Sequence, residues 1–186
     1  FRCIDLLEEC LADVEVSVSF VALSYVWGQI AQSIRLLGGN IAQLKEKNAI
    51  SSTDTRFPKT IRDAMTLCKD LGIRYLWVDA LCIIQDSPDK MHQIKWLHVI
   101  YQRALFTIVA AHGESAEAGL PGIGPGSRPG HQHVSNIQGL RLAQISLDLD
   151  IALLSSYWRT RAWTFQEYLL SPRKLIFTQH RIYFAC

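Results

Sequence analysis

The sequence predicts an α/β domain with a mostly parallel sheet flanked by helices. Two apolar runs typical of buried strands, residues 75–78 and 105–111, each follow a segment with helical spacing of apolar side chains. The chain has 186 residues and no internal repeat, so we expect a single domain over residues 1–186. Because it begins with Phe1 and ends in a strand-like run, we expect it to be a segment excised from a longer protein.

The first strand is expected in VSVSFVALSYVWG, residues 16–28, which is rich in β-branched and aromatic side chains. Residues 16–34 lack charges but carry four Ser, two Gln and one Gly, which favours a buried strand over a membrane span. A short helix is a candidate at residues 41–47. Between Pro58 and Gly72, apolar side chains at helical spacing predict the clearest helix, and the strand that follows it ends at Asp79.

The second half of the chain continues the alternation. A helix is expected around residues 94–104, followed by the strand in LFTIVAA. Gly and Pro in residues 113–139 indicate a long surface excursion, and residues 140–147 are a strand candidate. A helix over residues 159–171 and a C-terminal β-hairpin, formed by KLIF and RIYFAC, complete the prediction.

Composition argues against several classes of protein. The net charge of +2 favours neither nucleic acid nor an anionic membrane as a partner. Five scattered cysteines without a CxxC pair indicate no disulfide framework and no zinc site, and they favour a reducing, cytoplasmic location. No signal peptide is visible. His131 and His133 have no identifiable further ligands, so we assign no metal.

Candidate binding residues lie where the predicted strands end. In doubly wound sheets, ligands bind beyond the carboxyl ends of the strands, and Tyr25, Trp27, Gly28 and Asp79 occupy such positions. Gly28 permits a tight turn or a close approach to a ligand, while Tyr25 and Trp27 are equally compatible with a structural role. Asp79 either accepts hydrogen bonds from ribose hydroxyls or caps the following turn.

Three blocks of sequence resemble the HET domain, the heterokaryon incompatibility domain of filamentous fungi. They are ALSYVWG, then FPKTIRDAMTLCKDLGIRYLWVDALCIIQD with IYQRALFTIVAAHGESAEAGLPG, and RAWTFQEYLLSPRKLIF. The resemblance implies a cytoplasmic domain that signals cell death when unlike hyphae fuse, or a related fungal defence protein. The sequence departs from the family pattern at Gln29, where an acidic residue is common, and at Ala80, where Ser is common. The segment DKMHQIKWLHVIY also lacks the usual Trp near its start and the usual Met near Leu97.

The HET domain is in turn similar to the TIR domain, which implies a TIR-like, flavodoxin-like sheet. In TIR domains that cleave NAD, a WxxxE helix supplies the catalytic glutamate, and WTFQE makes Glu167 the corresponding candidate. If residues 159–171 are helical, Arg159, Trp163 and Glu167 share one face. Trp163 would stack on a ring, and Arg159 or Arg161 would bind a phosphate oxygen. The alternative is a surface glutamate beside a tryptophan that packs in the core.

The sequence therefore predicts a cell-death signalling domain that hydrolyses NAD at its nicotinamide glycosidic bond through Glu167. NAD enters as a substrate and no cofactor is expected. The alternative is a non-enzymatic module that self-associates or recruits partner signalling domains. A third interpretation makes Cys82 a nucleophile, but Ile83 and Ile84 follow it, which favours a small core residue.

Overall fold

A computed structural model describes residues 1–28, 34–124, 126–128, 134–143 and 148–186. The main sheet has seven strands in the order β2-β1-β4-β3-β5-β8-β9, and a separate ribbon pairs β6 with β7. The strands are β1 (Arg2–Asp5), β2 (Cys10–Asp13), β3 (Phe20–Ser24), β4 (Tyr75–Val78), β5 (Thr107–Ala110), β6 (Val134–Ile137), β7 (Leu140–Ala143), β8 (Lys174–Phe177) and β9 (Ile182–Ala185).

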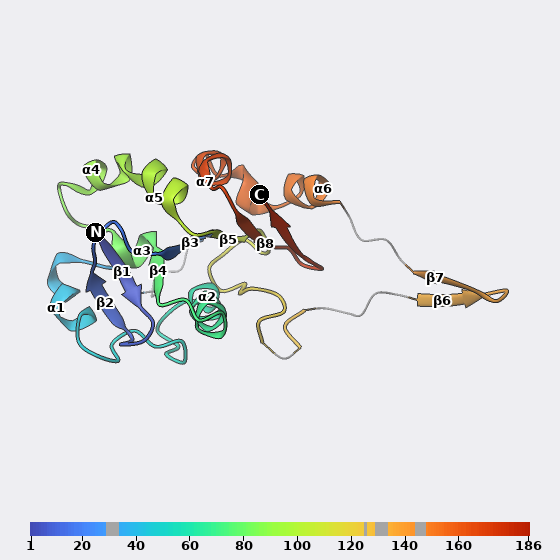
Figure 1. Cartoon of the computed structure of the whole chain (residues 1–186), viewed down its shortest axis with the longest axis horizontal. Helices are drawn as coiled ribbons and strands as arrows, with labels where there is room; N and C mark the ends of the chain where they lie inside the picture. Colours follow the sequence, from blue (N-terminus) through green and yellow to red (C-terminus); the bar gives the residue numbers. More distant parts are fainter. Residues whose placement is uncertain (29–33, 125, 129–133, 144–147) are drawn as a thin grey trace.

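The helices are α1 (Ile41–Leu44), α2 (Lys59–Asp70), α3 (Asp79–Cys82), α4 (Lys90–Lys95), α5 (Leu97–Arg103), α6 (Leu149–Leu154) and α7 (Thr164–Leu170). Two 3₁₀ helices, η1 (Gly38–Asn40) and η2 (Tyr157–Thr160), are also present. In Figure 1, α4, α5 and α7 lie on one face of the sheet and α2 lies on the other. The molecule is thus a sheet with helices on both faces, as the sequence predicts.

The centre of the sheet is parallel. β3 pairs in parallel with β4 on one side and with β5 on the other, and β5 pairs in parallel with β8. Taken in chain order, these four strands follow the 2-1-3-4 arrangement of flavodoxin-like sheets. The order reverses between β3 and β5, so the crevice at the carboxyl end of β3 is where a ligand site is expected. The predicted fold class is confirmed.

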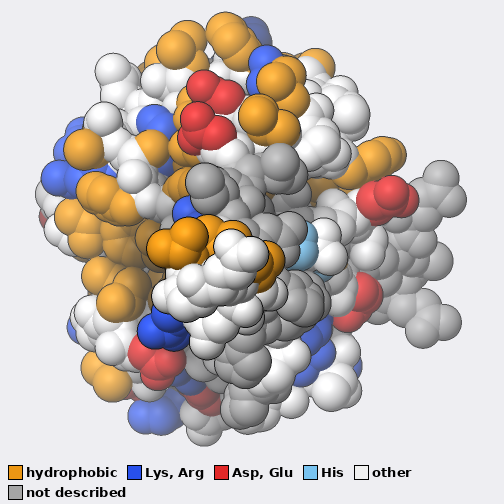
Figure 2. Space-filling view, turned by 90° about the vertical axis from the view of Figure 1, so that its right-hand side faces the viewer, with side chains coloured by type: hydrophobic (Ala, Val, Ile, Leu, Met, Phe, Trp, Pro, Cys, Tyr) orange, Lys and Arg blue, Asp and Glu red, His pale blue; other side chains and the backbone are white. Residues whose placement is uncertain are grey.

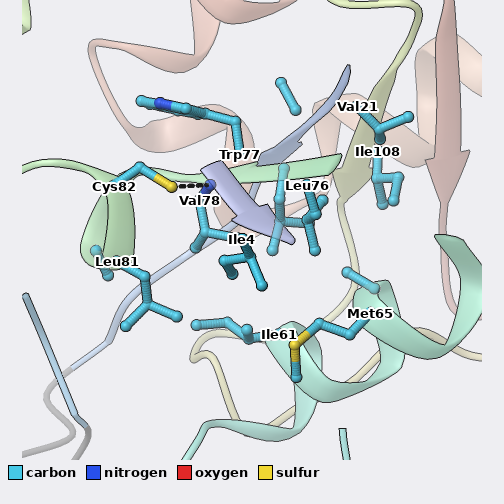
Figure 3. Packing of buried hydrophobic residues seen from close by; sticks show 14 of the residues in the cluster. Ile4, Val21, Ile61, Met65, Leu76, Trp77, Val78, Leu81, Cys82 and Ile108 are labelled. Carbon is cyan, nitrogen blue, oxygen red and sulfur yellow. Dashed lines mark hydrogen bonds between the residues drawn. The ribbon is translucent and has the colours of Figure 1, made fainter. Parts of the chain in front are cut away.

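Core side chains fill both faces of the central strands. Successive side chains of a strand point to opposite faces, and in Figure 3 Leu76 and Val78 point toward α2 while Trp77 points to the other face. On the α2 side they meet Ile61 and Met65, two of the apolar side chains that recur at helical spacing in the sequence. All five residues of β3 are buried, as in a strand covered on both faces.

Antiparallel strands form both edges of the sheet. At the carboxyl end of the chain β9 pairs antiparallel with β8, which confirms the expected hairpin. At the other edge β1 pairs with β4 and β2 with β1, both antiparallel. Neither of these four-residue strands was predicted from the sequence, because each is too short for its pattern of apolar side chains to stand out.

Two expected elements differ from the prediction. The helix expected around residues 94–104 is instead two helices, α4 and α5, separated at Trp96. The strand candidate at residues 140–147 contains β7, but β7 pairs with β6 rather than with the main sheet, and all eight residues of the ribbon are exposed. Residues 144–147 lie outside the described part. Figure 1 shows the ribbon extending away from the sheet.

No helix in the described residues is both long and apolar enough to span a bilayer. On the side of the molecule that Figure 2 shows, basic, acidic and apolar side chains are interspersed among the described residues. No single charge sign dominates that face.

Candidate functional site

Glu167 is buried, with 6% of its surface exposed. Its helix, α7, begins at Thr164 and not at Arg159, because η2 ends at Thr160 and Arg161 is extended. The expected helical stripe of Arg159, Trp163 and Glu167 is therefore wrong. The expectation that Trp163 packs in the core is also wrong: the side chain is 50% exposed, just before the first turn of α7.

A buried hydrogen-bond chain holds the Glu167 carboxylate at the end of β3. The hydroxyl of Ser24, the last residue of β3, donates to Glu167 Oε2. Ser24 Oγ in turn accepts a hydrogen bond of 2.8 Å from the indole Nε1 of Trp158 in η2. Because buried polar groups are costly when unpaired, this chain fixes the direction of the carboxylate. Glu167 points toward the sheet and not toward solvent, and it forms no salt bridge within the described residues.

The far end of α7 is tied to β5. The Ser171 hydroxyl donates to the main-chain oxygen of Glu167 over 2.6 Å and lies 2.7 Å from the hydroxyl of Thr107 in β5. Both hydroxyl groups are buried. The helix that carries Glu167 is thus fixed to the two strands, β3 and β5, between which the strand order reverses.

Charge and burial act in opposite directions on Glu167. Burial raises the pKa of its carboxyl, while the hydrogen bond from Ser24 and the nearby Arg161 guanidinium lower it. The pKa remains raised on balance. Arg161 itself is held by a hydrogen bond from Nη1 to the main-chain oxygen of Tyr25. Arg161 is therefore a cation close to both Glu167 and Asp79, and its predicted role in binding a phosphate oxygen stays a prediction.

Asp79 lies in the same electrostatic environment. Its pKa is raised to about 7: burial and, after it, the negative charge of Glu167 raise the pKa, while Arg161 and the hydrogen bonds from Ala80 and Trp27 lower it. The carboxylate accepts hydrogen bonds from the Trp27 indole over 2.9 and 3.0 Å and from the Ala80 main-chain N–H over 2.7 Å. Asp79 is the first residue of α3, whose N-cap is Val78 without a side-chain cap hydrogen bond, so neither of its two expected roles is confirmed.

Tyr25, Trp27 and Gly28 form the loop after β3. The Tyr25 side chain is buried, and burial raises its pKa well above the usual value. The Arg35 guanidinium lies 5.3 Å from the centre of the Trp27 ring, so Trp27 connects Asp79 to a second cation. Gly28 has a φ of +68°, and a Cβ at this position would lie 2.7 Å from Ser115 Cβ. Here the glycine permits a turn packed against another loop.

A small cavity lies at Glu167. This cavity, of about 10 Å³, is lined by residues of α5 and α7 together with Trp163, among them Tyr101 and His98. Its volume is roughly that needed by one water molecule. Arg159 is exposed, and its side chain makes no hydrogen bond or ion pair with the described residues. The structure therefore brings together Ser24, Tyr25, Trp27, Asp79, Arg161 and Glu167, with Trp163 at the margin.

Cys82 does not have the environment of a nucleophile. It is buried, and burial raises its pKa to about 12, which keeps the thiol protonated. Its sulfur accepts a hydrogen bond from the Val78 main-chain N–H, shown in Figure 3. The described ranges contain no group of three or more His, Cys, Asp or Glu side chains placed to hold a metal ion. His131 and His133 lie outside those ranges.

Sequence reasoning missed Ser24 and Trp158. Ser24 interrupts the apolar run FVALSYV, and a hydroxyl in a strand buried on both faces needs a buried partner. The sequence therefore contained a signal for Ser24. The partners of Ser24, Glu167 and Trp158, are 143 and 134 residues away in the chain, and no local pattern identifies them.

Comparison with known proteins gives one match. The family model described as Heterokaryon incompatibility protein (HET) matches residues 20–167, from the first residue of β3 to the buried glutamate of α7. No curated protein and no solved structure matches the chain.

Proposed function

Because this chain belongs to the heterokaryon incompatibility (HET) family, we propose that it signals fungal cell death by hydrolysing NAD at the nicotinamide glycosidic bond. Family membership supports the role in heterokaryon incompatibility and cell death. One observation carries the enzymatic part: a buried carboxylate, Glu167, lies at the carboxyl end of β3, where it interacts electrostatically with Asp79 and Arg161.

The reaction makes modest chemical demands. The bond between the ribose C1′ and the pyridinium nitrogen breaks, and nicotinamide leaves as a neutral molecule with the bonding electron pair. Water forms the new bond to C1′ and releases one proton to solvent. Positive charge develops on the ribosyl ring, and an ionised Glu167 would stabilise it more strongly in a buried site than in water. Arg161 lowers the pKa of Glu167 and so favours the ionised form.

The remaining site residues have roles that follow from their positions. Asp79 accepts hydrogen bonds from ribose hydroxyls in its ionised form. The exposed Trp163 stacks on a ring of the substrate, and the exposed Arg159 binds a phosphate oxygen. Because the cavity at Glu167 has room for about one water, the Trp163 side chain must turn aside to admit the nicotinamide ring.

Nicotinamide release tests this proposal directly. Purified domain, concentrated or artificially clustered, is incubated with NAD, and nicotinamide is measured for the wild type and Glu167→Gln. We expect release by the wild type and a loss of at least about a hundredfold in the variant, which cannot stabilise the cationic ring. The control is Glu46→Gln, which alters an exposed carboxylate. Equal release by all three proteins would remove Glu167 from the mechanism.

A non-enzymatic signalling module is the second candidate, and one observation favours it. Three large apolar side chains of the α7 region are exposed, namely Trp163, Phe165 and Leu169. Such a group of apolar side chains is typical of an interaction surface. Analytical ultracentrifugation compares the wild type with the double variant Phe165→Ser and Leu169→Ser. The non-enzymatic module is supported if the wild type associates in a concentration-dependent way, the double variant does not, and even clustered domain releases no nicotinamide.

A further inference from the structure

A second cavity, much larger than the one at Glu167, lies on the opposite side of α5. Its volume is about 380 Å³, within the range of about 300–1,000 Å³ that small-molecule sites occupy. Val99, Ile100 and Arg103 of α5 line it, whereas Leu97 and Tyr101 of the same helix line the cavity at Glu167. The proposed NAD chemistry uses none of its residues.

The walls of this larger cavity, which we call the α5 cavity, are mostly apolar. The side chains belong to the sheet, to α4 and α5 and to the loop after α3: they are Phe20, Trp77, Ile83, Trp96, Val99 and Ile100. Trp77 points to the face of the sheet opposite α2 (Figure 3), and α4 and α5 cover a face of the sheet opposite α2 (Figure 1). Trp96, where the chain breaks between α4 and α5, is 54% exposed. An aliphatic or aromatic body would therefore gain by leaving water here.

The charged side chains of the α5 cavity are all cationic. Arg2 is fixed by two hydrogen bonds, from Nε to the Cys82 main-chain oxygen over 3.0 Å and from Nη2 to Gln93 Oε1 over 2.7 Å. Its Nη1 has no hydrogen-bond partner among the described residues. The guanidinium of Arg103 makes no hydrogen bond or ion pair within the described part of the chain. Among the residues that the structure describes, no Asp or Glu lines the cavity.

We infer that the α5 cavity binds a small anionic amphiphile, a molecule with an aliphatic or aromatic body and one carboxylate. The apolar walls take up the body, and Arg2 and Arg103 bind the carboxylate through N–H donors that have no partner among the described residues. An arginine already fixed by hydrogen bonds loses little side-chain entropy when it binds an anion, which favours carboxylate recognition. A neutral amphiphile of the same length lacks the interaction with the two arginines.

Titration calorimetry with decanoate, below its micelle concentration, tests the inference on the purified chain. We expect saturable binding of one decanoate, with decanol bound more weakly. Arg103→Gln should weaken decanoate binding by roughly ten- to a hundredfold, the loss expected for one charge-assisted hydrogen bond. Arg141→Gln, which changes an exposed arginine on the β6–β7 ribbon, should leave the affinity unchanged.

A second variant locates the binding site. Val99→Trp fills the cavity and should abolish decanoate binding while circular dichroism remains that of the wild type. If that variant does not fold, Trp96→Ala is used instead: it removes part of the apolar wall, so decanoate should bind more weakly, and this half-exposed side chain can be removed with less effect on the core. The inference is overturned by absence of saturable heat, by equal affinity for decanol and decanoate, or by binding that neither Arg103→Gln nor the cavity variant changes.

Discussion

Replacing Asp79 with asparagine should remove a pH dependence of stability that the wild type shows. The pKa of Asp79 is raised from an ordinary 3.8 to about 7, mainly by burial. A difference of about three pKa units corresponds to about 4 kcal/mol of differential stability between the two protonation states. Because the folded pKa is raised, the protonated form is the one that the fold favours. The contribution of Asp79 to stability is therefore fully present below about pH 4 and is lost as the pH rises to about 7.

Asp79→Asn mimics the protonated carboxyl at every pH. Trp27 and Ala80 can still donate to the amide oxygen, although more weakly than to a carboxylate. About 4 kcal/mol is therefore an upper limit for the difference in pH-dependent stability between the wild type and the variant. Urea unfolding followed by circular dichroism at pH 4 to 8 gives the free energy of unfolding. We expect the variant to lose less stability than the wild type as the pH rises. Asp70→Asn, which removes an exposed carboxylate, is the control. Parallel curves for wild type and Asp79→Asn would refute the reasoning.

Two further predictions concern the turn after β3 and the buried thiol. Gly28→Ala should lower the free energy of unfolding by about 1–3 kcal/mol, because a Cβ would be strained at a φ of +68° and would overlap Ser115. The control, Gly39→Ala, should cost much less, since no atom lies within 4 Å of the added Cβ. Equal denaturation midpoints for the two variants would contradict this prediction. Iodoacetamide at pH 8 should label the exposed Cys186 rapidly and Cys82 only on unfolding, since burial raises the Cys82 pKa to about 12; mass spectrometry that finds both labelled at similar rates in folded protein would disprove it.

Sequence reasoning succeeded where local signals agree. The helix between Pro58 and Gly72 was predicted because apolar spacing, the proline at its start and the glycine at its end indicate the same element, and α2 has nearly these bounds. The segment around Glu167 gave no such agreement. Ala162, Phe165 and Leu169 suggest a longer helix with an apolar stripe in the core, yet the structure exposes Phe165 and Leu169 and buries Glu167 instead. Tertiary contacts decided which face points inward.

The candidate site was predictable only in part. Strand ends could be located from the sequence, which placed Tyr25, Trp27 and Asp79 at one edge of a parallel sheet. The contacts among these residues could not be predicted, because they join side chains from segments far apart in the chain. The hydrogen bond between Trp27 and Asp79 spans 52 residues, and that between Arg161 and Tyr25 spans 136.

The hydrogen bond between Ser24 and Glu167 also determines at what stage of synthesis the candidate site can form. Domains begin to fold from the amino end while the chain is still being synthesised, and the carboxyl group that meets Ser24 is made 143 residues later. Strands β3, β4 and β5 all precede α7, so an emerging chain can form the strand end that receives the carboxylate long before it contains the carboxylate. Unfinished or cleaved chains that lack α7 would lack the buried Glu167 carboxylate and its hydrogen bond with Ser24. Under the function proposed above such chains would be inactive, and this order of synthesis would protect the cell that makes them.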